Sequence, residues 1–246
     1  MVRRGSVAAL ALVWGLGAAA PAWAEGRLAF FASGEDLATE GFVGAQLTRD
    51  GWALTFDHIF VTVTALTAHQ AEPPYDAMAG GEIQATTSVV LAGEHSFDLV
   101  EADADDRVLI GEVEAPVGHF NALSWRMTPA TAGPAAGYAM VFVGTAERDG
   151  VVVPFVLRNA EARTYRCGEF VGDERKGFVV AGGMADLELT FHLDHVFGRA
   201  DKAADDPTNL DALGFDAFAA GGEHEITLRG MHIGHAGEGH CDVVWE

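Results

Sequence analysis

The chain has 246 residues, a formal net charge of −21 at pH 7 and two cysteines. A surface this acidic repels nucleic acid and anionic membranes, which argues against both as partners. It is compatible with a protein that gathers cations, and the length is ample for a sizeable hydrophobic core.

The first 24 residues have the composition of a secretory signal peptide. Arg3 and Arg4 form a short basic start, residues 7–20 form an apolar core, and Ala22-Trp23-Ala24 matches the small-residue pattern of a cleavage site. The apolar core is too short to span a membrane as a helix. We therefore expect cleavage after Ala24, with residues 25–246 exported to the periplasm or secreted as a single domain without a membrane span.

The exported part predicts strands throughout, because residues of high β propensity alternate with polar ones between glycine- and proline-rich turns. The longest β run is 53–67, and Asp149-Gly150 suits the tight turn of a hairpin. In chain order, the expected strands are 27–33, 53–67, 83–91, 95–101, 107–114, 121–127, 138–148, 151–160, 187–197 and 224–229. One helix is expected near 209–219, where the apolar residues fall at roughly helical spacing.

These elements define the expected fold class. The chain lacks the alternation of strands and helices that builds a parallel sheet, and it has no long internal repeat. Many short strands with frequent turns are typical of antiparallel sandwiches and barrels. We therefore predict one all-β domain, an antiparallel β-sandwich of the immunoglobulin-like or transthyretin-like kind, with a single short helix near 209–219.

Cys167 and Cys241 form an even pair in a chain with an export signal, which favours a disulfide between them. Closing a loop of this length stabilises a fold by roughly 2–4 kcal/mol. The alternative, a metal site that uses both thiolates, is disfavoured by the oxidising compartment that the signal peptide implies. We predict the disulfide.

Residues 187–198 contain the pattern on which the functional hypothesis depends. Residues 187–193 alternate between apolar and polar side chains, as a half-buried strand does, and they lead into His192, Asp194 and His195. In an ideal strand His195 points away from the other two, so all three converge only if the strand bends or ends near residue 193. Imidazole with carboxylate is the ligand set of Zn²⁺ and also suits Cu²⁺ or Fe²⁺. The alternatives are a polar strand end without metal, or a site in which Asp194 or His195 orients a ligand.

A related pattern occurs earlier in the chain. Residues 57–60 and 194–197 both read Asp-His-aliphatic-Phe, so the same step recurs in two expected strands. The repeat makes His58 an expected metal ligand, whereas the alternative is a histidine satisfied within the core. Glu35, in the turn after the first strand, is a candidate carboxylate ligand or else a solvated turn acid. The expected main site is therefore His58, His192 and His195, with Glu35 or Asp194 as the carboxylate.

The glycine-rich tail 231–241 contains a second histidine cluster. His232, His235 and His240 could fold around an ion, and a disulfide at Cys241 would hold the tail against the body of the protein. Met231 could favour copper at this position. The alternative is a loop whose histidines are incidental. We expect these three histidines to form a second, auxiliary metal site.

Three segments carry a resemblance to known proteins. T-F-H-L-D-H-V-F-G at 190–198, F-D-H-I-F at 56–60 and the terminal G-E-G-H-C resemble a group of exported bacterial β-rich proteins with a T-F-H-x-D-H-x-F-G strand motif. That group has no established activity. The resemblance therefore implies only an exported, β-rich, metal-binding protein.

The short signatures of common enzyme classes are missing from the sequence, which has no Gly-x-Ser-x-Gly, no His-Glu-x-x-His and no phosphate-binding loop. Their absence does not exclude an enzyme, because catalytic groups can converge from anywhere in a fold, but we expect a binding protein. The expected function is periplasmic binding of a divalent transition metal, zinc first and copper as the alternative, for capture or delivery. The expected partners are the metal ion and a metal transporter or outer-membrane receptor. Two competing hypotheses are a metal-dependent hydrolase with an open position for water and a structural module with incidental histidines.

Overall fold

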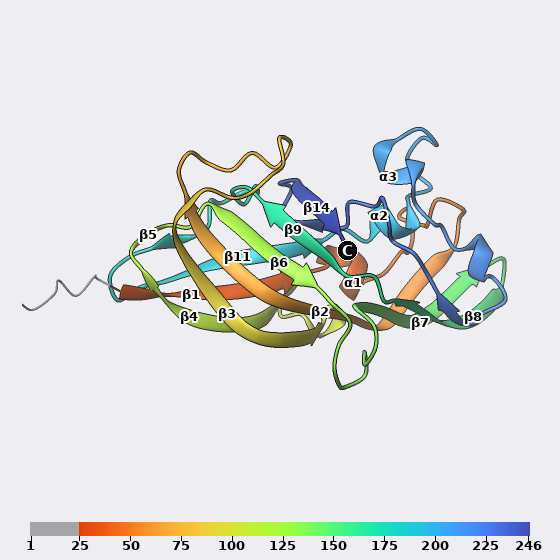
Figure 1. Ribbon diagram of the computed structural model, residues 1–246. Helices are drawn as coiled ribbons and strands as arrows, with labels where there is room; N and C mark the ends of the chain where they lie inside the picture. Colours follow the sequence, from red (N-terminus) through yellow and green to blue (C-terminus); the bar gives the residue numbers. More distant parts are fainter. Residues whose placement is uncertain (1–24) are drawn as a thin grey trace, which may run out of the picture.

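The computed structural model describes residues 25–246, and the predicted signal peptide, residues 1–24, lies outside the described residues. Strands dominate the described part, which also has three short α-helices and two short 3₁₀ helices. None of its helices is long and apolar enough to cross a membrane. Figure 1 shows the strands arranged as sheets packed against one another.

The larger sheet has eight strands and is organised around the long strand β2 (Ala53–Ala71). The first half of β2 pairs with β7 (Met140–Arg148), the second half pairs with β6 (Ala122–Met127), and β3 (Ala85–Asp98) also pairs with the second half. Four further strands extend the sheet at its two ends: β8 (Val151–Asn159), β12 (Gly222–Glu225), β9 (Arg163–Cys167) and β14 (Cys241–Trp245). Because its register shifts at several points, β2 crosses the molecule as a curved strand, which can be followed in Figure 1.

The smaller sheet has four strands in the order β13-β11-β1-β4. These strands are β13 (Gly234–His235), β11 (Met184–Phe191), β1 (Glu25–Ser33) and β4 (Arg107–Pro116). A separate short ladder joins β5 (Gly118–His119) to β10 (Phe178–Val179). The helical segments are α1 (Glu35–Thr39), α2 (Asp194–Phe197), α3 (Pro207–Leu210), η1 (Leu99–Glu101) and η2 (Asp216–Phe218).

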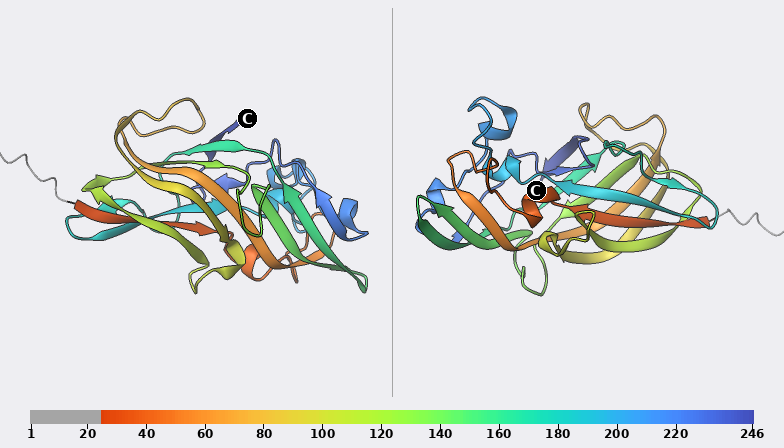
Figure 2. Two further views of the ribbon diagram at one scale, coloured as in Figure 1. Left: turned by 60° about the horizontal axis from the view of Figure 1, so that its bottom comes forward. Right: turned by 180° about the vertical axis from the view of Figure 1, so that it is seen from behind.

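One continuous core joins the two sheets. Leu28 and Phe30 of β1, Val61 and Val63 of β2 and Trp125 of β6 are all buried in the same hydrophobic cluster. Figure 2 shows the smaller sheet packed over the half of the larger sheet that contains β2, β3 and β6. The prediction of an all-β, sandwich-like fold is therefore confirmed.

Two strand pairings depart from the purely antiparallel arrangement that we expected. β1 pairs with β11 in parallel, and β8 pairs with β12 in parallel. The alternation of apolar and polar residues reports which face of a strand is buried, and it carries no information on the direction of the neighbouring strand. The parallel pairs therefore could not be read from the pattern.

The expected helix at 209–219 is wrong. The structure has the short helix α3 and the single turn η2, with Gly214 between them at φ +65°. A Cβ atom at Gly214 would collide with the carboxylate of Asp50. That carboxylate accepts hydrogen bonds from the backbone N–H groups of Phe215 and Asp216, so a side chain replaces the helical acceptors. The apolar spacing here reflects packing of an irregular segment.

Two local predictions are confirmed. β7 and β8 form a hairpin across Asp149-Gly150, both of which have positive φ, as a tight hairpin turn requires. Cys167 and Cys241 lie opposite each other on β9 and β14 and form the predicted disulfide. The bond fixes the end of the glycine-rich tail to the larger sheet.

Candidate metal centre

The parallel pairing of β1 and β11 brings two distant segments to the same edge of the smaller sheet. Ser33, at the end of β1, is in register with Thr190, near the end of β11. Two residues beyond these positions the chain carries Glu35 and His192, so the topology places the two side chains together. The Oε2 atom of Glu35 lies 3.9 Å from Nδ1 of His192.

Glu35 has an uncommon backbone conformation. Its φ of +54° lies in the left-handed region, which residues other than glycine rarely adopt. The N–H of Glu35 donates to Oγ of Ser33 at 3.0 Å, which holds the turn. Residues kept in such a conformation concentrate at functional sites, because the surrounding structure has to maintain them.

The strand that carries the histidine motif ends early. β11 stops at Phe191, and Asp194–Phe197 form the single helical turn α2, which ends at Gly198. The change from strand to helical turn lets His192, Asp194 and His195 converge, as the sequence pattern required. One potential ligand atom from each lies within 4.8 Å of the others. The expectation that 57–60 and 194–197 are equivalent strand steps is wrong, because the first lies in β2 and the second in α2.

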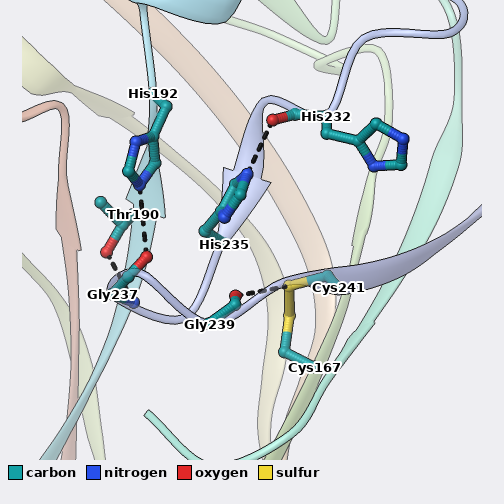
Figure 3. Close-up of a disulfide and its surroundings, with 8 residues drawn as sticks. All are labelled: Cys167, Thr190, His192, His232, His235, Gly237, Gly239 and Cys241. Carbon is teal, nitrogen blue, oxygen red and sulfur yellow. Dashed lines mark hydrogen bonds between the residues drawn. A yellow bond between two sulfur atoms is a disulfide. The ribbon is translucent and has the colours of Figure 1, made fainter. Parts of the chain in front are cut away.

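The C-terminal tail folds back onto this point. β13 pairs with the end of β11, where His235 is opposite Thr190. The N–H of His192 donates to the carbonyl of Ile233 at 2.9 Å. Figure 3 shows the tail held between β11 and the disulfide of Cys241, with the rings of His192 and His235 close together.

Gly237 makes the return of the tail possible. Its φ is +61°, and a Cβ atom there would collide with the carbonyl oxygen of Val171. The N–H of Gly237 donates to Oγ1 of Thr190 at 3.0 Å, which ties the turn to β11. The glycine-rich composition of the tail therefore reflects close backbone packing beside the histidines.

Four imidazole rings gather at this point. The ring centroids of His192 and His235 are 4.4 Å apart, those of His195 and His235 are 5.5 Å apart, and those of His192 and His195 are 5.8 Å apart. The ring of His240 lies 5.2 Å from that of His235. Protonated rings at these distances would repel one another, so the cluster suits neutral imidazoles.

The hydrogen bonds assign the free nitrogen of two rings. Nε2 of His235 lies 2.8 Å from the carbonyl oxygen of His232, and Nε2 of His192 lies 3.2 Å from that of Gly237. A carbonyl only accepts, so each Nε2 carries the hydrogen and donates it, and each Nδ1 keeps a lone pair. Nδ1 of His235 is buried and has no hydrogen-bond partner among the described residues.

The pKa values agree with neutral rings. Burial lowers the pKa of His235 to about 3, and the neighbouring His192 acts in the same direction. Burial also lowers the pKa of His195, although the carboxylate of Asp194 acts in the opposite direction. Both rings are therefore available as electron-pair donors at neutral pH.

Carboxylates surround the same histidines. Glu35, His192 and Glu238 form a second group whose potential ligand atoms lie within 4.8 Å of one another. Burial raises the pKa of Glu35, the attraction of His192 lowers it, and the neighbouring charges of Glu238 and Asp194 raise it. Oδ1 of Asp194 is buried without a hydrogen-bond partner in the described structure. A cation at this point would neutralise crowded negative charge.

His58 is not brought to this cluster. Its Nδ1 lies 2.6 Å from Oδ2 of Asp98, and its ring stacks on Phe60. Oδ1 of the same aspartate accepts the N–H groups of Ile59 and Val100, which fixes the carboxylate. His58 is in no potential ligand group found within residues 25–246; His235 is in none either, but its ring lies 4.4 Å from that of His192. The structure therefore groups His192 and His195 with Asp194 and Glu35 but leaves His58 at a separate place on β2.

The three tail histidines are divided. His235 is buried beside His192 and His195, whereas His232 and His240 are exposed. His232 contributes its backbone carbonyl to His235, and its ring points away in Figure 3. His240 and His195 both line a hollow of about 210 Å³ at the protein surface. The two expected clusters thus meet as one group through His235.

Sequence reasoning missed Glu238 and the role of Asp98. Glu238 lies between two glycines in the tail, and that position beside the histidines is the only local signal for it. Asp98 precedes a 3₁₀ turn forty residues away from His58, so nothing in the local sequence links the two.

Comparisons of the chain with protein-family models, curated proteins and solved structures found no match. The function is therefore inferred from the donor atoms themselves. Two of these, Nδ1 of His235 and Oδ1 of Asp194, are buried polar atoms without a partner in the described part of the chain. Both are atom types that bind transition metals.

Proposed function

We propose that this protein is exported and binds a divalent transition metal, zinc in the first place, for capture or delivery. The observation that carries the proposal is the buried ring of His235, anchored through Nε2–H with its Nδ1 lone pair unpartnered among the described residues. A ligating histidine commonly donates its other ring N–H to a carbonyl, which fixes the tautomer and the direction of the free nitrogen. A buried acceptor without a donor costs free energy, and a bound cation removes that cost.

Three histidines and one carboxylate would form the centre. His192, His195 and Asp194, whose potential ligand atoms lie within 4.8 Å of one another, would supply three ligands, with Glu35 as the alternative carboxylate. His235, whose ring centroid lies 4.4 Å from that of His192, would turn its Nδ1 toward the same ion as the fourth ligand. Three imidazoles with one carboxylate are a tetrahedral set that suits Zn²⁺. The Nε2–H of His192 also donates to a backbone carbonyl, so its tautomer is fixed in the same way as that of His235 and its Nδ1 is left free among the described residues.

Charge supports binding at neutral pH. Because burial lowers the pKa of His195 and His235, these rings need not lose a proton before they bind a metal. The net charge of −21 attracts cations toward the protein as a whole. The ring centroid of the exposed His240 lies 5.2 Å from that of His235, so a solvent-accessible imidazole lies beside the buried one. This arrangement favours exchange of the ion with a partner over permanent storage.

Two observations support export. The disulfide between Cys167 and Cys241 is of a kind that persists in oxidising compartments such as the periplasm. Residues 1–24 carry the composition of a signal peptide. In that compartment a metal transporter or an outer-membrane receptor would be the partner in delivery.

The test is metal analysis combined with two matched variants. Protein purified from the periplasm without a histidine tag should contain one equivalent of zinc per chain by elemental analysis. Competition with a chromophoric chelator should show that His235→Ala weakens zinc binding by at least about 100-fold, since a buried ligand is lost. His58→Ala should leave the affinity unchanged, because its ring contacts Asp98 instead.

The possible outcomes distinguish the identity of the metal from the location of its site. Copper in place of zinc, with the same loss in His235→Ala, would keep the site and change the metal. Wild-type zinc affinity in His235→Ala would exclude the proposed centre. A loss in His58→Ala equal to that in His235→Ala would mean that binding depends on residues outside the histidine cluster.

A further inference from the structure

Two of the tail histidines are not among the ligands of the centre proposed above. His232 and His240 are both exposed, and both line the surface hollow of about 210 Å³. Figure 3 shows the ring of His232 directed away from His235. The same hollow is also lined by His195 of the proposed centre, so these two imidazoles lie next to that centre.

Two methionines share that space. Met78 and Met231 line the same hollow, and together with His232 they also line a second hollow of about 250 Å³. Side chains that border two neighbouring hollows lie between them. Met78, Met231 and His232 therefore lie at the boundary of the two hollows, and His240 lines the first hollow with them.

The two methionine side chains differ in their exposure and in the part of the structure that holds them. Met231 is only 7% exposed and packs into the hydrophobic core, whereas Met78 is 82% exposed on the loop between β2 and β3. That loop is fastened to the larger sheet because Arg166 on β9 pairs with Glu82 in the loop and with Asp242 on β14. A loop held by ion pairs thus brings an exposed thioether to a hollow that a buried thioether also lines.

Thioether and imidazole form a soft set of ligands. Methionine sulfur is a poor ligand for Zn²⁺, Mg²⁺ or Ca²⁺, and it selects Cu⁺ and similar ions. Asp211 and Asp242 border the hollows as well, but carboxylates are hard ligands and do not account for two methionines at the same hollow. We propose that Met78, Met231, His232 and His240 form a second site that binds a soft monovalent ion of the Cu⁺ class, with ligands of its own, beside the zinc centre whose His195 lines the same hollow.

The first experiment uses Ag⁺ as a probe, because it shares the ligand preference of Cu⁺ and does not change oxidation state during the titration. Zinc-loaded protein with ¹³C-labelled methionine methyl groups is titrated with Ag⁺ in chloride-free buffer. One equivalent should shift the methyl signals of Met78 and Met231 and leave those of Met127, Met140 and Met184 in place. The zinc content should not change.

The second experiment compares matched variants. Met78→Leu combined with Met231→Leu should weaken Ag⁺ binding by at least about tenfold and leave zinc affinity unchanged, because leucine keeps the volume and removes the sulfur. Met184→Leu is the control, since Met184 is also exposed, at 56%, but borders neither hollow. Met78→Leu alone lies outside the core and should show part of the same loss even if the double variant folds poorly.

The results that would overturn the second site differ from those that would exclude the zinc centre. If Ag⁺ binds the Met78→Leu and double variants as tightly as wild type, the methionines are not ligands. If Ag⁺ displaces zinc without shifting the two methyl signals, the ion enters the buried centre and there is no second site. A protein that holds no zinc but shows both methyl shifts would leave the soft site intact and reject only the proposed function.

Discussion

Asp194 and Glu35 are two carboxylates at one histidine cluster, but their surroundings differ. Asp194 is grouped with two histidines and has a buried oxygen without a partner in the described structure, whereas Glu35 is grouped with His192 and the like-charged Glu238. We expect Asp194→Asn to lower zinc affinity by at least about tenfold, because the ligand charge is lost. Glu35→Gln should change it by less than about threefold. Chelator competition at pH 7 measures both, and the reverse ranking would place Glu35 in the coordination shell.

At this scale the sequence predicted one convergence of side chains and missed another. His192, Asp194 and His195 are close in sequence, so their convergence depended only on where one strand ends. His235 was assigned to another cluster, because its contact with His192 depends on the pairing of β13 with β11. Local patterns carry no information on such pairing.

The repeated Asp-His-aliphatic-Phe step led to the opposite error, because it grouped two histidines that lie apart in the structure. His58 looked equivalent to His195 because the two share four residue types in a row. Its environment is set by Asp98, whose buried carboxylate comes from another strand. The residue types of the two segments are the same, but Asp98, the partner that sets the environment of His58, lies outside the repeated segment.

At the scale of elements, the disulfide should control the tail. It joins β9 to β14 and fixes the chain only six residues after His235. Replacing both Cys167 and Cys241 by serine should lower the free energy of unfolding by roughly 2–4 kcal/mol, measured by guanidinium unfolding. Zinc affinity should fall as well, because His235 would have to be ordered on binding. Unchanged zinc affinity in a destabilised variant would show that β13 alone positions His235.

The elements themselves were predicted where local chemistry decides them. The hairpin at Asp149-Gly150 follows from a turn that only certain residues adopt, and the β class follows from alternation. The helix near 209–219 failed because Asp50, far away in sequence, captures its backbone N–H groups. A hydrogen bond from a distant side chain leaves no trace in the spacing of apolar residues.

For the whole molecule, the buried ring of His235 predicts a pH dependence of stability. Its pKa is about 3 in the folded protein and near 6.5 when the chain is unfolded. Above pH 6.5 the ring is neutral in both states and its contribution to stability is fully present. As the pH falls toward 3, only the unfolded chain takes up the proton, so the free energy of unfolding decreases by up to about 1.4 kcal/mol per pH unit.

The lowered pKa of His195 acts in the same direction, whereas the raised pKa of Glu35 acts in the opposite one. The contribution of His235 is therefore isolated by comparison with His235→Leu. Urea unfolding at pH 4, 5, 6 and 7 with a chelator present should give a shallower pH dependence in the variant, by about one proton. Equal slopes for both proteins would mean that the ring can be protonated without unfolding.

The pairing of β11 with both β1 and β13 joins segments that are far apart in the sequence, so the histidine cluster cannot assemble until most of the chain has been made. Glu35 stands near the start of the described chain, His192 lies in its last third, and His235 lies close to its end. A chain synthesised from its N-terminus exposes the carboxylate first and completes the centre only when the tail has been made. Contacts of such large separation form late, because much chain entropy has to be lost before they are gained. Under the proposed function, metal loading would be the closing event of biogenesis, and a chain that stops before Gly234 would lack His235.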